Sequence, residues 1–198
     1  ADEVAAKIQE RQRERKFCTL AIGTGTSLRP LFTELVRRHK DEGLSFRNVI
    51  VFNLYEFYPL TEGNGSTFGQ LNSLFLSQTD IDRQNVFTID GSIPQNAISE
   101  HCRLYEQRIQ TFGGIDIVLM GIGREGNIGM NEPGSHASSP TRLILLDATS
   151  RSEAARNWGV DNLPPCSITM GVQTILSARK IYLLTWGEDK ADIIQKAV

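Results

Sequence analysis

Apolar residues along the chain follow two kinds of pattern. Short continuous apolar runs are typical of strands that are buried on both faces. Such runs lie at residues 17–22, 49–54, 86–89, 115–120, 143–146 and 181–186. Between several of these runs, apolar residues recur every three or four positions, which is the spacing of an amphipathic helix. The three clearest stripes are Leu31, Phe32, Leu35 and Val36; Phe68, Leu71, Leu74 and Phe75; and Ile98, Cys102, Tyr105 and Ile109.

Alternation of strand-like and helix-like segments predicts an α/β fold. We expect three layers, with a Rossmann-like, mostly parallel sheet that carries helices on both faces. Helical patterns also occupy residues 2–15 and 189–198, and the second shows no capping signal. We therefore interpret residues 1–198 as a single domain that is truncated at both ends or belongs to a longer chain. A frayed natural terminus is the alternative.

Composition and charge indicate which kinds of partner the protein is not expected to bind. The 198 residues are 40% hydrophobic and 22% charged, with a formal net charge of −2, which suits one globular domain. The basic stretch at residues 11–16 is interpreted as a solvated helix face, so no nucleic-acid partner is expected. No apolar stretch approaches the roughly 20 residues that span a bilayer, and no signal-peptide pattern is present, so we expect a cytoplasmic protein without membrane contact. Three widely spaced cysteines suggest packing thiols, and we expect no metal and no other cofactor.

Two of the loops that follow predicted strands have features suited to anion binding. Residues 23–27 combine glycines with hydroxyl side chains just before a helix, which predicts either a phosphate cradle or a plain strand-to-helix turn. After the last apolar run, Lys190 lies near a helix N-terminus, where a cation is unfavourable unless an anion binds there. Arg156 adds a further cation, with an ordinary surface charge as the alternative.

Two other loops carry carboxylates. Residues 121–133 follow a buried strand and hold Glu125, Asn127 and Glu132 among several glycines, without a histidine. This predicts a polar site at the carboxyl edge of the sheet. Glu56 follows the second strand among aromatic residues, where it is either an acid–base group with a raised pKa or an ordinary, partly exposed residue.

Together these loops resemble the glucosamine-6-phosphate deaminase/isomerase family, whose relatives include 6-phosphogluconolactonase and ribose-5-phosphate isomerase-like folds. The resemblance covers nearly all of the chain and rests on residues 23–27, 44–49, 52–56, 102–106, 113–116, 121–133, 141–142, 170–172 and 187–190. It implies that the protein binds a sugar phosphate. The implied phosphate ligands are Gly25, Thr26, Ser27, Arg156 and Lys190, with charge-assisted hydrogen bonds from the two cations.

The resemblance also implies a catalytic set, and two of its members are replaced here. The family uses a histidine to move a proton between O5 and O1 of the sugar, and an aspartate to move hydrogen between C1 and C2. Asn127 stands at the histidine position and Tyr55 at the aspartate position, while Glu125, Glu132 and Glu56 match family acids. Asn127 can hydrogen-bond a ring oxygen but has no titratable proton near neutral pH, and a tyrosine with a pKa of about 10 is a poor base.

Three functions remain open at this point. The first is a deaminase/isomerase-like protein of carbohydrate metabolism that binds an amino-sugar or hexose phosphate and uses Glu125, Glu56 or Tyr55 in a different way. The second is a non-catalytic sugar-phosphate binding or regulatory domain. The third is a lactonase-like hydrolase, although those relatives also use a histidine at the Asn127 position. Sugar-phosphate binding is the main prediction, and a homo-oligomer or a fused partner domain is compatible with it.

Overall fold

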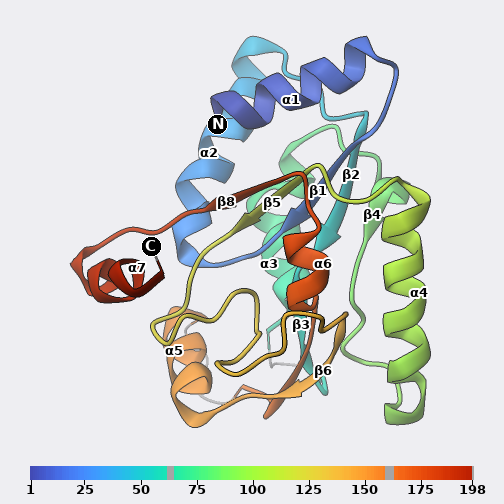
Figure 1. The fold of residues 1–198 in the computed structure, drawn as a ribbon. Coiled ribbons are helices and arrows are strands. Elements are labelled where there is room, and N and C mark those ends of the chain that lie inside the picture. The colour runs from blue at the N-terminus through green and yellow to red at the C-terminus, as the bar shows by residue number, and fades with distance from the viewer. Residues whose placement is uncertain (62–64, 159–162, 198) are drawn as a thin grey trace.

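A parallel sheet forms the centre of the protein (Figure 1). The computed structural model describes residues 1–61, 65–158 and 163–197. In this part of the chain, five strands lie in the order β4-β2-β1-β5-β8, and all neighbouring strands run parallel. Their bounds are β1 (Cys18–Ile22), β2 (Val49–Asn53), β4 (Val86–Phe87), β5 (Ile117–Met120) and β8 (Lys180–Leu183). The predicted mostly parallel α/β sheet is thus confirmed.

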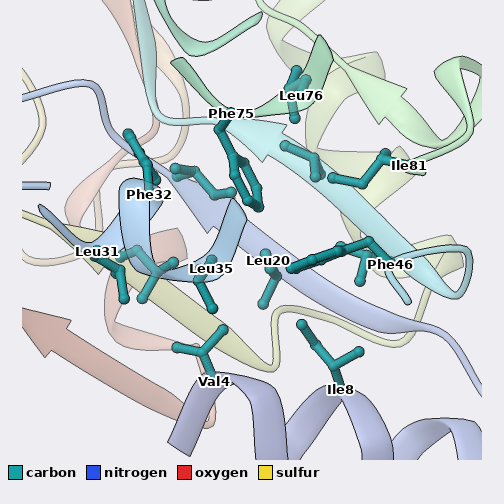
Figure 2. Close-up of a cluster of buried hydrophobic side chains, with 14 of the residues drawn as sticks. Val4, Ile8, Leu20, Leu31, Phe32, Leu35, Phe46, Phe75, Leu76 and Ile81 are labelled. Atoms are coloured by element: carbon teal, nitrogen blue, oxygen red, sulfur yellow. The ribbon is translucent and has the colours of Figure 1, made fainter. Parts of the chain in front are cut away.

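Both faces of this sheet are covered, which explains why its strands are apolar without alternation. Leu20 and Leu119 belong to one buried cluster, whereas Phe52 and Val118 belong to another on the opposite face. Figure 2 shows the first cluster, to which the first two helices contribute Val4, Ile8, Leu31, Phe32 and Leu35. The helices on that side are α1 (Asp2–Arg13), α2 (Arg29–Glu42) and α3 (Thr67–Leu74), and those on the other are α4 (Ile98–Thr111) and α6 (Val172–Leu176).

The remaining described helices are short or lie at the edge of the fold. They are α5 (Ala148–Trp158), α7 (Ala191–Ala197) and the 3-10 turns Thr26–Leu28, Leu76–Gln78, Arg83–Asn85, Gln95–Ala97 and Glu188–Lys190. Among the helices of the described ranges, none has the length and apolar character needed to cross a membrane.

A second, antiparallel sheet corrects one part of the prediction. Its strands lie in the order β3-β7-β6, with bounds β3 (Tyr55–Tyr58), β7 (Cys166–Thr169) and β6 (Arg142–Leu145). The apolar run at residues 143–146 therefore does not enter the central parallel sheet. Because β6 pairs within this sheet only with β7 and keeps an open edge, it is incompletely covered, and Leu145 is 72% exposed.

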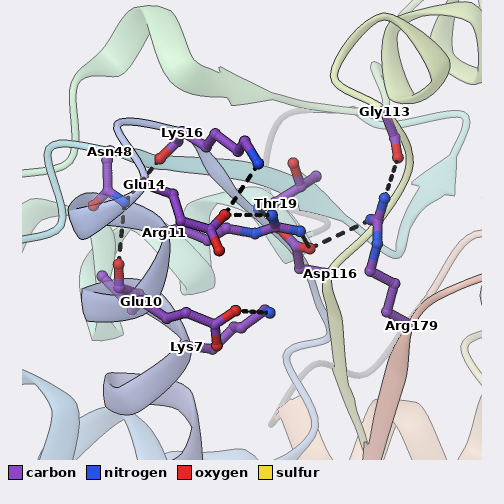
Figure 3. A network of polar contacts seen from close by, with 11 residues as sticks. Lys7, Glu10, Arg11, Glu14, Lys16, Thr19, Asn48, Gly113, Asp116 and Arg179 are labelled. Atoms are coloured by element: carbon purple, nitrogen blue, oxygen red, sulfur yellow. Dashed lines mark hydrogen bonds and ion pairs between the residues drawn. The ribbon is translucent and has the colours of Figure 1, made fainter.

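A charged cluster joins the amino ends of the central strands to the helices around them (Figure 3). Asp116, which is almost fully buried just before β5, accepts hydrogen bonds from Arg11 Nε at 3.3 Å and from the main-chain nitrogen of Thr19 at 3.0 Å. Arg179 Nη1 lies 3.3 Å from the same carboxylate. These contacts connect α1, β1, β5 and the residue before β8, at the edge of the sheet opposite the carboxyl ends of the strands.

Candidate functional site

A cavity of about 410 Å³ lies at the carboxyl ends of β1, β5 and β8. This is where an open α/β sheet binds its ligands, because the loops that leave parallel strands meet at one edge. Its walls come from the loop after β1, the loop after β5, the segment after β8 and the helix α5. The lining residues are Gly23, Gly25, Thr26, Ser27, Leu54, Tyr55, Met120, Gly121, Ile122, Gly123, Arg124, Asn127, Gly129, Met130, Ser150, Ala154, Arg156, Leu184, Thr185, Trp186, Asp189 and Lys190.

The loop after β1 forms one wall of the cavity. Gly25, Thr26 and Ser27 all line it, and the 3-10 turn that begins at Thr26 leads directly into α2. The loop after β5 approaches this wall closely, since a Cβ on Gly121 would lie 2.7 Å from Ser27 Oγ. Glycine at this position therefore allows the two loops to meet. The loop thus places the hydroxyl-bearing residues Thr26 and Ser27 on the wall of the cavity, which suits a phosphate cradle.

Three cationic side chains line the same cavity, although they are far apart in the sequence. Arg156 comes from α5, Lys190 precedes α7, and Arg124 follows β5. Asp189, the acidic residue of the lining, lies 3.2 Å from Arg124 Nη2. The structure thus brings together all five residues predicted to hold a phosphate. Cations outnumber carboxylates on the described walls, which favours an anionic ligand.

Tyr55 lines the cavity beside the predicted phosphate loop. Its side chain is 8% exposed, and its hydroxyl lies 3.4 Å from Thr24 Oγ1. Burial raises the pKa of the Tyr55 phenol above its ordinary value. The phenol consequently stays protonated near neutral pH, where it can donate a hydrogen bond to a ligand but cannot act as a general base.

Asn127 also lines the cavity, and its amide nitrogen is already engaged. Nδ2 donates to Glu132 Oε2 at 2.5 Å and to Ser150 Oγ at 3.2 Å. An amide nitrogen has two protons, so both are used within the protein. A hydrogen bond from Asn127 to a ring oxygen would have to replace one of these two contacts, and it stays a prediction.

Two carboxyl groups, those of Glu132 and Asp147, lie close to Asn127 and Ser150. Ser150 Oγ lies 3.0 Å from Glu132 Oε2 and 3.2 Å from Asp147 Oδ2, and the main-chain nitrogen of Asp147 donates to Glu132 Oε1 at 3.2 Å. Burial raises the pKa of Glu132, and its hydrogen bond with Asp147 raises it further. The main-chain N–H of Ser150 and the hydrogen bond from Glu132 lower the pKa of Asp147. The pKa values of the two carboxyl groups are thus displaced in opposite directions, that of Glu132 upwards and that of Asp147 downwards.

Ser150 and Asp147 were not among the predicted site residues. One signal in the sequence could have pointed to Asp147, since an acid just before a helix is a preferred cap. Its Oδ1 indeed accepts from the main-chain nitrogen of Ser150 at 2.8 Å. No comparable sequence signal points to Ser150. It lies on the cavity because α5 packs beside the loop after β5.

Like Glu132, the predicted acids Glu56 and Glu125 do not line the cavity. Glu56 is 1% exposed, and its carboxylate accepts from the main-chain nitrogens of Thr67 and Phe68 at 2.9 and 3.1 Å and from Ser66 Oγ at 2.7 Å. These contacts place Glu56 at the N-terminus of α3, where a carboxylate is favourable. Glu125 is exposed in the loop after β5. A catalytic role for either residue stays a prediction.

Comparison with known proteins shows the family to which the chain belongs. The family model of glucosamine-6-phosphate isomerases/6-phosphogluconolactonase matches residues 1–198. A glucosamine-6-phosphate deaminase-like protein of Bacteroides thetaiotaomicron is 57% identical over 200 residues; the match covers 100% of this chain and 30% of that protein, so the chain spans less than a third of its length. Glucosamine-6-phosphate deaminase 1 of Bacillus subtilis is 34% identical, with 98% of this chain and 81% of that protein covered.

Solved structures show the same fold. A monomeric glucosamine-6-phosphate deaminase superposes with a TM-score of 0.87 at 35% identity, covering 98% of this chain and 80% of the other. The 6-phosphogluconolactonase of Thermotoga maritima has a TM-score of 0.73 at 16% identity, covering 98% and 82%. By its sequence matches and its fold, the chain belongs to the family of glucosamine-6-phosphate isomerases and 6-phosphogluconolactonases.

Proposed function

We propose that the cavity binds the phosphate of an amino-sugar or hexose phosphate and that the chain serves carbohydrate metabolism through this binding. The observation that carries the proposal is the convergence of the loop around Ser27 with Arg156 and Lys190 on one cavity. The named deaminase relatives support a phosphorylated amino sugar as the ligand.

Each part of the cavity suits a different part of such a ligand. Main-chain N–H groups and hydroxyls at Gly25, Thr26 and Ser27 can donate to phosphate oxygens, while Arg156 and Lys190 supply charge-assisted hydrogen bonds. Tyr55 and Asn127 then face the sugar, the first as a donor. This arrangement recognises a polyhydroxy compound that carries an anion at one end.

Binding is proposed as the main function because the groups for aldose–ketose conversion are altered. A positioned general acid or base contributes typically 10²–10⁴-fold to a rate. Tyr55 has a raised pKa and Asn127 does not titrate, so the conversion is expected to be slower by at least about one such factor. Deaminase/isomerase turnover is the second candidate, favoured by the partly buried Glu132 next to the cavity.

Thermal unfolding tests the binding proposal. Glucosamine 6-phosphate should raise the melting temperature in a concentration-dependent manner, whereas glucosamine without the phosphate should have little effect. Arg156→Ala should remove most of the shift. Arg103→Ala, which changes an exposed arginine on α4 outside the cavity, serves as the matched control and should leave the shift unchanged. The proposal fails if no hexose or pentose phosphate stabilises the protein.

Ammonia and fructose 6-phosphate release from glucosamine 6-phosphate tests the second candidate. Release that Glu125→Gln abolishes would assign turnover to the acids of the loop after β5. Ligand-dependent stabilisation without release would leave the binding function standing alone.

A further inference from the structure

We propose that Arg124 and Asp189 set the charge specificity of the cavity, so that it prefers the dianion of a phosphate monoester over a singly charged ester of the same shape. This inference rests on the proposed function, since it needs a sugar phosphate in the cavity. It deepens that function by assigning the choice of anion to two residues outside the set that is predicted to hold the phosphate.

Arg124 and Asp189 form an ion pair between two walls of the cavity. Arg124 lies on the loop after β5, Asp189 lies in the 3-10 turn before α7, and both line the cavity. Arg124 Nη2 donates to Asp189 Oδ2 at 3.2 Å. Asp189 directly precedes Lys190, which is one of the two cations proposed to bind the phosphate. The charges of the pair are therefore placed where they act on a bound anion.

The two walls also touch beside the ion pair. A Cβ on Gly126, in the loop after β5, would lie 3.4 Å from Ile193 Cδ1 of α7, so the loop packs closely against this helix. A Cβ on Gly187 would lie 2.7 Å from Asp189 Oδ1, so the carboxylate of Asp189 lies over that glycine. The ion pair thus joins two segments that are already in contact, and both of its charges stay at the cavity.

The pair contributes to the balance of charge on the walls. Among the lining residues that the structure describes, the side chains with a formal charge at neutral pH are Arg124, Arg156, Lys190 and Asp189. Three cations and one carboxylate leave a formal charge of +2. A phosphate monoester carries about −1.5 to −2 at pH 7, because its second pKa is about 6. The described walls therefore match the charge of one phosphate dianion.

The preference for a dianion depends on this balance. A phosphate ester and a sulfate ester of one sugar have similar shapes and differ by about one negative charge at pH 8, where the phosphate is a dianion. Changing the walls by one charge therefore changes the ratio of the two affinities by the Coulomb energy of a single charge pair. For charges about 8 Å apart and an effective dielectric constant of about 40, that energy corresponds to about sixfold.

Calorimetric titration with glucose 6-phosphate and glucose 6-sulfate at pH 8 and low ionic strength tests the inference. The wild type should prefer the phosphate. Arg124→Gln should lower this preference about sixfold, whereas Asp189→Asn should raise it about sixfold and bind the phosphate more tightly. The double substitution keeps the formal charge of the walls and should restore the wild-type preference. Added salt should reduce these differences, because it screens exposed charges.

Arg103→Gln is the matched control, because it removes an exposed arginine of an ion pair with Glu100 on α4, outside the cavity. It should leave the preference unchanged. A purely structural role of the Arg124–Asp189 pair makes a different prediction: both single substitutions then weaken the two esters alike and leave their ratio unchanged.

The outcomes separate this inference from the binding proposal. An unchanged ratio in Arg124→Gln overturns the inference and leaves the binding proposal intact. So does weaker binding of the phosphate by Asp189→Asn, or equal binding of both esters by the wild type. If neither glucose ester binds, the same comparison with glucosamine 6-phosphate and glucosamine 6-sulfate decides, and absence of binding there overturns both.

Discussion

The indole nitrogen of Trp186 donates a hydrogen bond of 2.8 Å to the main-chain oxygen of Ser27. Trp186 is 63% exposed and lines the cavity, so this bond holds a large aromatic ring beside the loop that is proposed to receive the phosphate. A ligand that occupies the loop must therefore alter the surroundings of the indole. The bond also connects the segment after β8 to the loop after β1.

Fluorescence of Trp186 is expected to report ligand binding. Titration with glucosamine 6-phosphate should change the emission in a saturable way, and Trp186→Phe should remove that change, although Trp158 remains in the variant. Loss of the indole hydrogen bond is worth about 0.5–1.5 kcal/mol, so affinity should fall roughly twofold to tenfold in calorimetry. An equal fluorescence change in the variant would contradict the prediction.

Glu56 is expected to stabilise the fold. Its carboxylate satisfies main-chain N–H groups at the start of α3, and removing it leaves several buried donors without a partner. Each such donor costs about 1–3 kcal/mol, so Glu56→Ala should lower the free energy of unfolding in urea by at least about 2 kcal/mol. Glu125→Ala, on an exposed loop, should change it by less than about 0.5 kcal/mol. Equal effects of the two substitutions would contradict this role.

Gly171 is expected to tolerate no side chain. A Cβ there would lie 2.0 Å from the main-chain oxygen of Ser139 and 2.2 Å from that of Pro140, and the backbone of this segment has to move to make room. Overpacking of this kind costs about 1–3 kcal/mol or more, so Gly171→Ala should lower the urea midpoint. Gly69→Ala places the same methyl group in α3, 3.5 Å from its nearest neighbour, and should instead stabilise by about 0.5–1 kcal/mol.

Two buried thiols are expected to be unreactive in the folded protein. Burial raises the pKa of Cys18 to about 12 and that of Cys102 to about 11. Because the thiolate is the reactive form, both thiols stay protonated at pH 8 and become appreciably reactive only as the pH approaches these values. Ellman's reagent at pH 8 should modify the half-buried Cys166 first, and it should reach the other two after unfolding. Rapid modification of all three in the native protein would contradict the burial.

The central sheet could be predicted because its three inner strands, β2, β1 and β5, are buried on both faces and therefore consist of continuous apolar runs. This rule does not predict the second sheet. β7 carries the buried hydroxyls of Ser167 and Thr169, and β3 contains the buried Glu56, so neither strand has a clear apolar period. These polar groups are compatible with burial because they form hydrogen bonds with the protein, which a pattern of hydrophobicity does not reveal.

Some residues of the candidate site could likewise be predicted from the sequence, and others could not. Arg156 and Lys190 belong to no sequence motif that by itself specifies an anion site; the resemblance to a family assigns both to one phosphate, and the structure places both on one cavity. Ser150 could not be found by spacing, because its neighbours Asn127 and Glu132 come from another loop. Contacts between loops depend on how α5 packs, and that packing is a property of the folded chain.

The Asp116 cluster has a consequence for how this family can change. It ties α1, β1, β5 and the residue before β8 together at the edge opposite the cavity, away from the loops that line it. Residues on the loops at the far edge, such as Asn127, can then change while the architecture persists. Similarity along the whole chain therefore measures similarity of the fold, and it does not measure similarity of the reaction.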